Sequence, residues 1–550
     1  MRTTGLLAGT TALALTIAGC DDERPSNQGG AGGQGGASSS SSGAGGQGGA
    51  SSSSSGTGGM TATGSGGTGG GPICTPGDAT ACDDQDPCTE DACSAGACAH
   101  SPAPAGTPCG AAMVCDSDSV CIASTAAWGT RFTGVDAFGG IAVDGAGSMA
   151  LVGSFSSIAD LGGGPLTSAG NSDVFVVRLD PFGIHVWSKG FGDAGWQQGN
   201  DIAVDAQGDI VIAGDFWGDL DFGGGVLPCH GAPGSPVGFL AKLGDKGEHR
   251  WSRCLSNDGQ NQTFALTMDA AGNTLITGYF AGTIDFGAGS MTSLGPGSDV
   301  FVASFDAGGQ VLWSRSFHLG TQDARDVAVD AAGNVFLSGA FIDAIHSADM
   351  MLLEESGFHT FVMKLDATGA VVWARSFGDA SQQTAWKIGA DAAGNLHAAG
   401  AFLGALDLGG PSLVSEGGTD AFAAKLDPDG NHLWSQRFGG AGDDWAQGLA
   451  LDATGAPVLA GSFMSSIDLG GGLLTSAGGD DVFVAKLDAD GQHLFSKRFG
   501  DGAGQQAFRA AAAGPGDALI FGRFAGNIDF GSGPITSNGA SDAFVGRVMP

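Results

Sequence analysis

Hydrophobic and polar positions along most of this chain follow one pattern that returns about every sixty residues. Each copy contains an apolar run of the form Asp-x-Phe-Val-x-Lys-Leu-Asp, followed by an alternating stretch of the form Trp-Ser-x-x-Phe-Gly. The Phe of the first motif stands at Phe175, Phe239, Phe301, Phe361, Phe422, Phe483 and Phe544, in steps of 64, 62, 60, 61, 61 and 61 residues. Seven copies of one unit therefore fill residues 126–550. A fixed period of this size with strand-like content predicts a solenoid or a propeller.

The fourth copy predicts the internal structure of the unit most clearly. Alternating and β-branched residues predict four short strands, A to D in chain order, over 326–330, 335–341, 360–365 and 371–377. Tight turns with an Asp and a Gly separate A from B and C from D. Four antiparallel strands of this kind make one propeller blade.

The two ends of the repeat region indicate how the ring closes. The last copy supplies strands A, B and C and then reaches Pro550, whereas residues 128–132 have the Trp-x-x-Arg-Phe pattern of a D strand and precede any A strand. We expect this N-terminal strand to complete the last blade, because an open ring leaves exposed sheet edges. The predicted fold is all-β: a closed seven-bladed β-propeller of four-stranded blades, preceded by a small disulfide-rich module.

Two motifs carry a resemblance to a known family. Ala-x-Gly-Asn-x-x-x-x-Gly-x-Phe and Phe-Val-x-Lys-Leu-Asp recur through residues 126–550, and this region resembles the bacterial seven-bladed beta-propeller repeat (SBBP-type) family. The resemblance implies the propeller fold. It implies no ligand, because that family is defined by its repeat and not by an activity.

The N-terminus predicts export and lipid attachment. Residues 1–19 combine one arginine with a largely apolar run, which predicts a signal peptide too short to span a membrane. The sequence Ile-Ala-Gly-Cys ending at Cys20 resembles a bacterial lipoprotein cleavage box, in which Cys20 becomes the lipidated first residue. An ordinary signal peptide with a chance cysteine is the alternative. Residues 20–72 are mostly Gly and Ser, and we expect a disordered tether. The expected location is extracytoplasmic, anchored to a bacterial membrane, with outer membrane, cell surface and periplasm left open.

Cysteines predict a second module at residues 73–122. Behind an export signal, a dense and even set favours four disulfides, whose pairing the spacing does not give. The set is Cys74, Cys82, Cys88, Cys93, Cys98, Cys109, Cys115 and Cys121. Cys229 and Cys254 form a further candidate disulfide, with two buried free thiols as the alternative. Acidic residues at 84–91 suggest either a structural Ca²⁺ site or solvated turns; we expect no other metal or cofactor.

Charge excludes some partners. The formal net charge is −35, with 57 acidic against 22 basic residues. Such a chain repels phosphate backbones and anionic lipid surfaces, so we expect no nucleic-acid partner and membrane contact only through the anchor. We expect the propeller to be monomeric.

The connections predict which rim carries function. The A–B and C–D turns are uniformly short, whereas the B–C and D–A connections on the opposite rim are long, and variable loops on rigid strands commonly carry function. Aromatic, amide and acidic residues in those connections are typical of sugar-binding faces and protein hot spots. The alternative is that the rings pack the loops onto the strands. The candidates are Trp196, Gln197, Trp217, Trp386, Asp443, Asp444 and Trp445.

Positions repeated in every blade predict structural roles. Six tryptophans share one D-strand position, with Phe495 in the remaining strand, and we expect them in the core. They are Trp128, Trp187, Trp251, Trp313, Trp373 and Trp434. Asp residues that recur before strand C are expected to cap turns. They are Asp173, Asp299, Asp420, Asp481 and Asp542.

Three functional hypotheses follow. No linear catalytic or phosphate-binding motif is present, which favours a non-catalytic recognition or scaffold module for an envelope protein or polysaccharide. The alternatives are a hydrolase or lyase centred on the channel of the propeller, because such sites are assembled from several blades, and a passive surface spacer.

Overall fold

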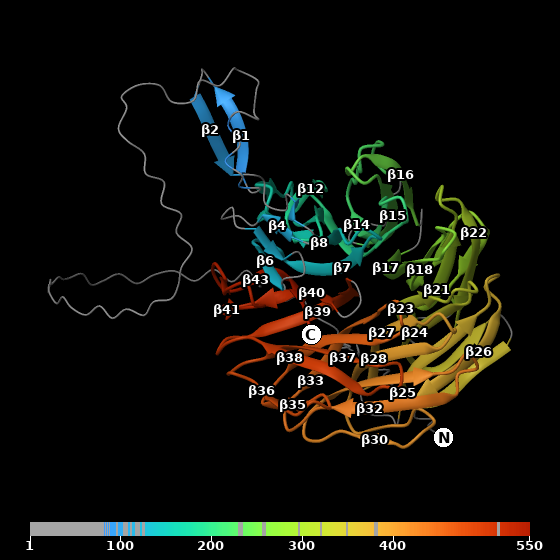
Figure 1. Ribbon diagram of the computed structural model, residues 1–550. Coiled ribbons are helices and arrows are strands. Elements are labelled where there is room, and N and C mark those ends of the chain that lie inside the picture. The colour runs from blue at the N-terminus through green and yellow to red at the C-terminus, as the bar shows by residue number, and fades with distance from the viewer. Residues whose placement is uncertain are drawn as a thin grey trace, which may run out of the picture.

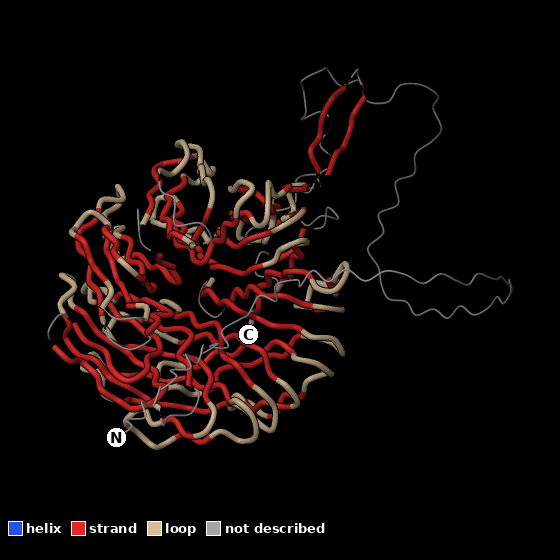
Figure 2. Tube along the Cα trace, turned by 180° about the vertical axis from the view of Figure 1, so that it is seen from behind, coloured by secondary structure: helices blue, strands red, loops and turns tan. Residues whose placement is uncertain are grey.

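The computed structural model is an all-β molecule, and no α-helix occurs in the part of the chain that it describes (Figure 2). Accordingly, that part holds no helix long and apolar enough to cross a membrane. The structure describes residues 82, 84, 86, 89–94, 97–102, 108–110, 113–115, 121–123, 127–228, 235–255, 260–294, 297–318, 322–347, 350–378, 383–513 and 517–550. The predicted signal peptide, Cys20 and the tether lie outside these residues and stay predictions.

Seven four-stranded antiparallel sheets follow one another around a ring (Figure 1). Blade 1 contains β7 (Ala137–Val143), β8 (Met149–Phe155), β11 (Asp173–Leu179) and β12 (His185–Phe191). Blade 2 contains β13 (Trp196–Val204), β14 (Ile210–Trp217), β15 (Val237–Leu243) and β16 (His249–Cys254). Blade 3 contains β17 (Gln260–Met268), β18 (Thr274–Ala281), β21 (Asp299–Phe305) and β22 (Val311–Phe317). Blade 4 contains β23 (Gln322–Val329), β24 (Val335–Ser347), β25 (Met350–Leu365) and β26 (Val371–Phe377).

The remaining blades keep the same order of strands A to D. Blade 5 contains β27 (Gln383–Ala390), β28 (Leu396–Phe402), β31 (Asp420–Leu426) and β32 (His432–Phe438). Blade 6 contains β33 (Asp444–Leu451), β34 (Pro457–Phe463), β37 (Asp481–Leu487) and β38 (His493–Phe499). Blade 7 contains β39 (Gln505–Ala512), β40 (Ala518–Phe524), β43 (Asp542–Val548) and, from the other end of the region, β6 (Trp128–Phe132).

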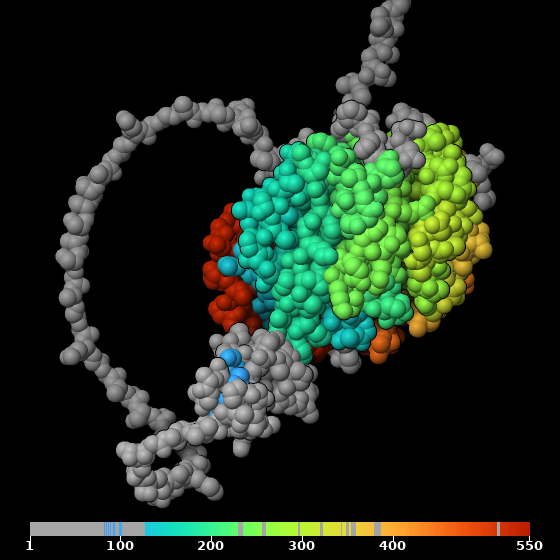
Figure 3. Space-filling view, turned by 90° about the horizontal axis from the view of Figure 1, so that it is seen from above, coloured from blue at the N-terminus to red at the C-terminus, as the bar shows by residue number. Residues whose placement is uncertain are grey.

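Strand β6 closes the ring as predicted. It pairs antiparallel with β43, from Ala543 opposite Phe132 to Arg547 opposite Trp128. The fully buried Phe132 then joins one hydrophobic cluster that contains residues of both blade 7 and blade 1. Figure 1 shows β6 and β43 side by side, and Figure 3 shows successive blades packed against one another from cyan through green to yellow. The first and last blades therefore share a core like any other neighbouring pair.

The core lies between blades and is built from strands B and C. Every residue of β8, β11, β34 and β37 is buried, whereas the D strands alternate between buried and exposed positions. This burial on both faces explains the continuous apolar runs of the B and C motifs. It also explains the Gly of the Gly-x-Phe motif, because a Cβ on Gly339 would lie 2.7 Å from the ring of Phe361.

Strand A begins earlier than the sequence predicted. In blade 4 it starts at Gln322 and not at Asp326, and the register of β23 against β24 shifts between Ala324 and Asp326. The other A strands carry the same kind of shift. A β-bulge adds one residue and so interrupts the period of two, which is why these residues resembled a loop in the sequence.

The long B–C connections are more ordered than predicted. Five blades fold them into small hairpins, and an apolar side chain of each, such as Phe286 in blade 3, is buried against the blade. In blade 4 the connection instead prolongs strands B and C into the long β24–β25 hairpin. The hairpins are β9 (Ile158–Asp160) with β10 (Pro165–Thr167), β19 (Thr283–Asp285) with β20 (Ser290–Thr292), β29 (Ala405–Leu406) with β30 (Leu413–Val414), β35 (Ser466–Asp468) with β36 (Leu473–Thr475), and β41 (Asn527–Ile528) with β42 (Ile535–Thr536).

The recurring D-strand tryptophans pack at the edge of the core clusters, as half-buried rings, and they also join neighbouring blades. Trp313 of blade 3 donates its indole N–H to the carbonyl of Ala367 in the C–D turn of blade 4, at 3.1 Å. Its ring covers Gly369 of the same turn. Four further tryptophans make the equivalent bond: Trp187, Trp251, Trp373 and Trp434.

Aspartates shape both rims. On the short rim, Asp427 Oδ1 accepts the N–H groups of Asp429 and Asn431, and the other Asp-x-x-Gly turns repeat this pattern. Ion pairs such as Lys486 Nζ to Asp452 Oδ2, at 2.6 Å, brace these turns from strand C. On the long rim, Asp481 accepts the N–H of Ala477, and equivalent bonds confirm that the Asp residues before strand C cap turns.

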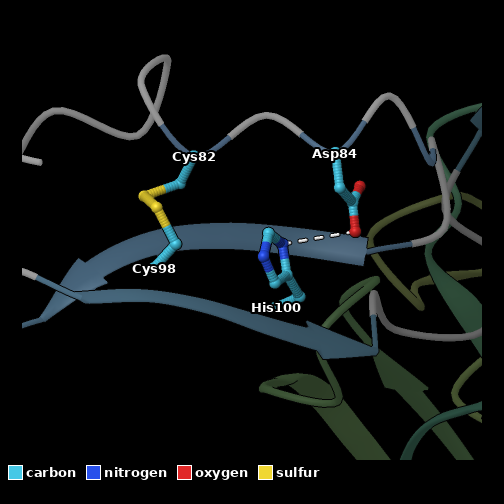
Figure 4. The surroundings of a disulfide bond; sticks show 4 residues. All are labelled: Cys82, Asp84, Cys98 and His100. Atoms are coloured by element: carbon cyan, nitrogen blue, oxygen red, sulfur yellow. Dashed lines mark ion pairs between the residues drawn. A yellow bond between two sulfur atoms is a disulfide. The ribbon is translucent and has the colours of Figure 1, made fainter. Parts of the chain in front are cut away.

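The cysteine-rich module contains β1 (Thr89–Ser94), β2 (Ala97–Pro102), β3 (Pro108–Gly110), β4 (Met113–Cys115) and β5 (Cys121–Ala123). A disulfide joins Cys82 to Cys98, and Cys93 is also disulfide-bonded (Figure 4). Asp84 lies beside His100, at 3.2 Å, and accepts hydrogen bonds from Asp86 N and Thr89 Oγ1. The remaining disulfides of the predicted set stay predictions. Cys254 of blade 2 is disulfide-bonded, and its predicted partner Cys229 lies outside the described residues.

Candidate binding site at the inner rim

Most of the predicted rim residues lie in strands and not in loops. Trp196 begins strand A of blade 2, and Trp217 ends strand B, where the two are cross-strand neighbours. Trp217 is 37% exposed, whereas Trp196 is half-buried. Gln197 is fully buried, and its amide N–H groups bind Asp193 Oδ1 at 2.6 Å and the carbonyl of Trp217 at 3.3 Å. Gln197 therefore holds the D–A connection in place and does not face solvent.

The candidates of blades 5 and 6 are also reassigned. Asp444 is fully buried in β33 and accepts the N–H of Gly440; burial, together with Asp420 and Asp443, raises its pKa to about 7. Asp443 is exposed and accepts the N–H of Thr419. Trp445 is half-buried opposite Ser462.

The three strand-A tryptophans do not form one platform. Trp386 stands at the bulge of β27, and its side chain lies outside the described ones. Counted from the bulge of its own strand, Trp196 lies four residues earlier and Trp445 two residues earlier. The three rings therefore occupy different depths and different positions in the repeat.

Two positions of the repeat bring chemically different side chains to the same end of the inner strands. The first is the bulge of strand A, occupied by Asn200, Phe264, Arg325, Trp386, Gln447 and Phe508 in blades 2 to 7. The second precedes the last Phe of strand B and is occupied by Ser154, Asp215, Tyr279, Ala340, Ala401, Ser462 and Arg523 in blades 1 to 7. Together with the strand-A residues paired to the second position, they define the inner rim. Strand A is the strand of each blade nearest the axis of a propeller.

Blades 3 and 4 build the first cluster of the inner rim, called the Tyr279 cluster. The rings of Phe264 and Tyr279 lie 5.5 Å apart, and the Tyr279 hydroxyl donates a hydrogen bond to Gln262 Oε1. Arg325 from blade 4 places its guanidinium 5.4 Å from the centre of the Phe264 ring. Asp323 holds that guanidinium in an ion pair at 2.7 Å. An aromatic face, an amide and an arginine therefore converge from two blades.

Blades 7 and 1 build the second cluster, called the Arg523 cluster, at the same repeat positions. Arg523 lies 5.7 Å from the centre of the Phe508 ring and donates from Nε to Gln506 Oε1 at 2.9 Å. Phe138 of blade 1 packs against Phe508 at 5.1 Å. Arg523 is exposed, and no carboxylate among the described residues forms an ion pair with it. Neighbouring Arg509 bonds the carbonyls of Phe508 and Phe138.

The buried carboxylates of the inner strands connect adjacent blades. Asp201 of blade 2 accepts the N–H of Leu266 in blade 3, at 2.9 Å, and Asp326 of blade 4 accepts the N–H of Ile388 in blade 5, at 2.7 Å. Asp215 accepts the N–H of Thr263, at 2.8 Å. Burial raises the pKa of Asp215 to about 7, although this hydrogen bond and one from Asn200 oppose the rise. These carboxylates therefore hold neighbouring blades together, whereas the hydrogen bond from Arg523 to Gln506 stays within blade 7.

The acid–base properties of Tyr279 favour binding over proton abstraction. Burial raises the pKa of its phenol to about 12, and the nearby carboxylates of Asp215 and Asp323 add to the rise. The phenol is therefore a hydrogen-bond donor near neutral pH and a poor general base. Across the described ranges, no group of three or more His, Cys, Asp or Glu side chains is arranged to hold a metal ion.

The sequence contains a signal for the inner rim that the loop-based interpretation missed. Aligning the seven copies on the final Phe of strand B places Tyr279 and Arg523 in one column with serine, alanine and aspartate. In this alignment, the residue before the final Phe varies in chemistry between copies, whereas the Phe itself does not vary. Such a variable position beside an invariant one is the sequence signal for the inner rim. The corresponding variable position on strand A could not be recognised in the sequence. The bulge inserts one residue there, so the alternation of apolar and polar residues resumes one residue out of phase.

Known proteins match this chain at low sequence identity. No protein-family model matches the chain. An uncharacterized WD repeat-containing protein of Acanthamoeba polyphaga mimivirus is 27% identical over 164 residues, which cover 27% of this chain and 12% of that protein. Regulatory protein FlaEY of Caulobacter vibrioides is 27% identical over 249 residues, which cover 43% of this chain and 24% of that protein. The matches thus span less than a quarter of either relative.

Solved structures are similar at low sequence identity. Sqt1 from Chaetomium thermophilum is 12% identical with a TM-score of 0.38, over 77% of this chain and 100% of that one. YCF48 bound to D1 peptide is 10% identical with a TM-score of 0.36, over 77% and 95%. A PL25 ulvan lyase is 10% identical with a TM-score of 0.37, over 72% and 93%.

Proposed function

We propose that this chain is a non-catalytic recognition module of a bacterial cell envelope, held at the membrane through Cys20 and binding an envelope ligand at the inner rim. The observation that carries the proposal is the contrast between repeat positions. Residues that join strands and blades recur around the ring, whereas the inner rim alone gathers aromatic, amide and arginine side chains that differ between blades. Binding sites commonly combine such aromatic and arginine side chains.

The chemistry of the inner rim supports binding more than catalysis. The Tyr279 phenol has a raised pKa, and the carboxylates of Asp201, Asp215 and Asp326 accept hydrogen bonds from the backbone of the next blade. A general base needs a pKa near the working pH and must reach the proton that it removes. The Tyr279 phenol lacks such a pKa, and the buried carboxylates cannot reach a substrate proton.

Substitutions copied from other blades of the same protein test this proposal. The variant Phe264→Asn, Tyr279→Ala, Phe508→Gln and Arg523→Ala replaces each inner-rim residue with the residue that another blade carries at that position (Asn200, Ala340, Gln447 and Ala340). Both full-length proteins are incubated with envelope material of the source cell, and co-sedimentation is measured. We expect the variant to keep the β-sheet circular dichroism spectrum and to lose binding.

Three results would overturn the proposal. Equal binding by a folded variant would place recognition away from the inner rim, and no binding by the parent protein would favour the passive spacer. Turnover of an envelope polymer by the parent protein would instead favour the enzyme.

A further inference from the structure

The inner rim differs in charge from the rest of the molecule. The whole chain has 57 acidic and 22 basic residues. Strands A and B, without the extended hairpin of blade 4, carry five acids and four bases. The acids are Asp201, Asp215, Asp323, Asp326 and Asp444, and the bases are Arg325, Lys387, Arg509 and Arg523. Strands A and B are therefore close to neutral within a strongly negative molecule.

The fold binds each of these acids, two through ion pairs and three through backbone hydrogen bonds. Asp326 pairs with Lys387 at 3.0 Å, Asp323 pairs with Arg325, and Asp201, Asp215 and Asp444 accept backbone N–H groups. The exposed guanidinium of Arg523 forms no ion pair within the described ranges. One carboxylate also belongs to its cluster, since Asp480 Oδ2 accepts a hydrogen bond from Gln506 Nε2 at 2.7 Å. The local preference is thus for an anionic group.

The two clusters share one arrangement that fits a sugar ring. Each has a Phe at the bulge of strand A and, two residues earlier, a glutamine that hydrogen-bonds the residue facing it on strand B. Each has an arginine within 6 Å of that Phe ring. An aromatic face packs against the C–H face of a sugar, an amide bonds hydroxyl groups, and a guanidinium binds a carboxylate in a bidentate manner.

We infer that the ligand of the inner rim is an acidic polysaccharide of the uronate type, with the Tyr279 cluster and the Arg523 cluster as two sugar-binding subsites. This inference rests on the proposed function. In the Arg523 cluster, Gln506 and the buried Phe508 orient the guanidinium, and Arg523 binds the carboxylate. In the Tyr279 cluster, the phenol donates its proton to Gln262, so its oxygen accepts from a sugar hydroxyl, and Asp323 fixes Arg325 against Phe264. Blades 3 and 7 lie on opposite sides of the ring, so one extended chain has a subsite on each side.

Isothermal titration of the full-length protein with oligogalacturonate tests this inference. Arg523→Gln is expected to weaken binding about tenfold or more, since a charge-assisted hydrogen bond contributes roughly 1.5–3 kcal/mol. Arg250→Gln is the matched control, because it removes the same charge from the exposed outer strand of blade 2 and should leave the affinity within about twofold. Tyr279→Phe, which removes one hydroxyl, should weaken binding several-fold in the second subsite.

Neutral dextran and dextran sulfate serve as the comparison ligands. Binding of oligogalacturonate and not of dextran, with loss in Arg523→Gln but not in Arg250→Gln, supports the inference. Equal losses in the two arginine variants mean a non-specific charge effect and overturn it. Preference for dextran sulfate shows that the arginine selects sulfate and overturns the uronate assignment.

No binding of any of the three polymers also overturns the inference. The proposed function is tested separately by the co-sedimentation experiment. It is supported if envelope material binds the parent protein and not the inner-rim variant.

Discussion

Single residues in this propeller fall into two groups according to whether they recur from blade to blade. Recurring residues have a partner at a fixed offset: Gly339 accommodates Phe361 across one blade, and Trp313 covers Gly369 of the next. Non-recurring residues such as Tyr279 and Arg523 occupy backbone positions that an alanine fills elsewhere in the ring. The fold requires the first group and tolerates change in the second.

One turn of blade 3 tests the requirement for glycine. Gly309 has a φ of 77°, and a Cβ there would lie 2.9 Å from the Trp251 ring, so Gly309→Ala should cost about 1–3 kcal/mol of unfolding free energy. Its neighbour Gly308 lacks the positive φ, and its nearest atom to a Cβ is 3.4 Å away, so Gly308→Ala should change stability by about 0.5 kcal/mol or less. Urea unfolding measures both; equal losses would contradict the assigned role of Trp251.

Asp215 makes stability depend on pH near neutrality. Its folded-state pKa of about 7 lies above the unfolded value, so the folded state binds the extra proton. The stability it contributes is present below about pH 4 and is lost as the pH rises to about 7. Asp215→Asn should flatten the fall of Tm between pH 4.5 and 7.5.

The exposed Asp429 provides the control for that experiment. Asp429→Asn removes a carboxylate from a solvent-facing turn and should leave the slope of Tm against pH as in the parent. Some slope should persist in Asp215→Asn, because the pKa of the buried Asp444 is also raised to about 7. An unchanged slope in Asp215→Asn would contradict the inferred titration.

At the scale of elements, sequence period predicted what is regular and failed where a strand is irregular. In blade 4, strand D has the predicted bounds, strand B begins at the predicted residue, and strand C ends at the predicted residue. The hairpin between B and C prolongs these two strands beyond the prediction. Strand A was predicted four residues short because its bulge at Arg325 shifts the alternation. The sequence therefore pointed to loops at this end of the ring and did not single out Tyr279, Phe508 and Arg523, the residues of the proposed inner-rim site.

Strand β6 is the element on which closure depends. Removing it exposes the edge of β43 and uncovers the cluster around Phe132, shared by blades 7 and 1. A protein that begins at residue 134 should melt well below one that begins at residue 127, and it should aggregate at lower concentration. Calorimetry and light scattering measure the two effects. Equal melting temperatures would mean that the ring is closed by contacts between the inner strands alone.

Stability at the short rim should depend on pH in the opposite direction to the contribution of Asp215: acid should lower it. Burial opposes ionisation of Asp452, but hydrogen bonds from Lys486, Thr454 and the backbone outweigh it and lower the pKa to about 2. The stability from this ion pair is therefore present above about pH 4 and is lost as the pH falls toward 2. Lys486→Met should make the loss of Tm between pH 4 and 2.5 smaller than in the parent. A parallel loss in both proteins would contradict the pairing.

At the scale of the whole molecule, the repeats explain architecture and their exceptions explain function. Seven nearly identical blades place the same position of each blade at the same height around one axis, so seven residues far apart in sequence meet at one end of the ring. Within the proposed function, the exposed Arg523 attracts an anionic ligand to that end of the ring. The N-terminal segment enters the ring through β6, so the predicted tether and the cysteine-rich module lead to the closing strand.

Hydrogen exchange of the full-length protein, with and without soluble envelope polysaccharide, tests the central claim most directly. We predict added protection at the inner-rim ends of β17, β18, β39 and β40 and unchanged exchange in the B–C hairpins and the outer D strands. Protection confined to the hairpins or the D strands, with the inner-rim ends unchanged, would contradict the account.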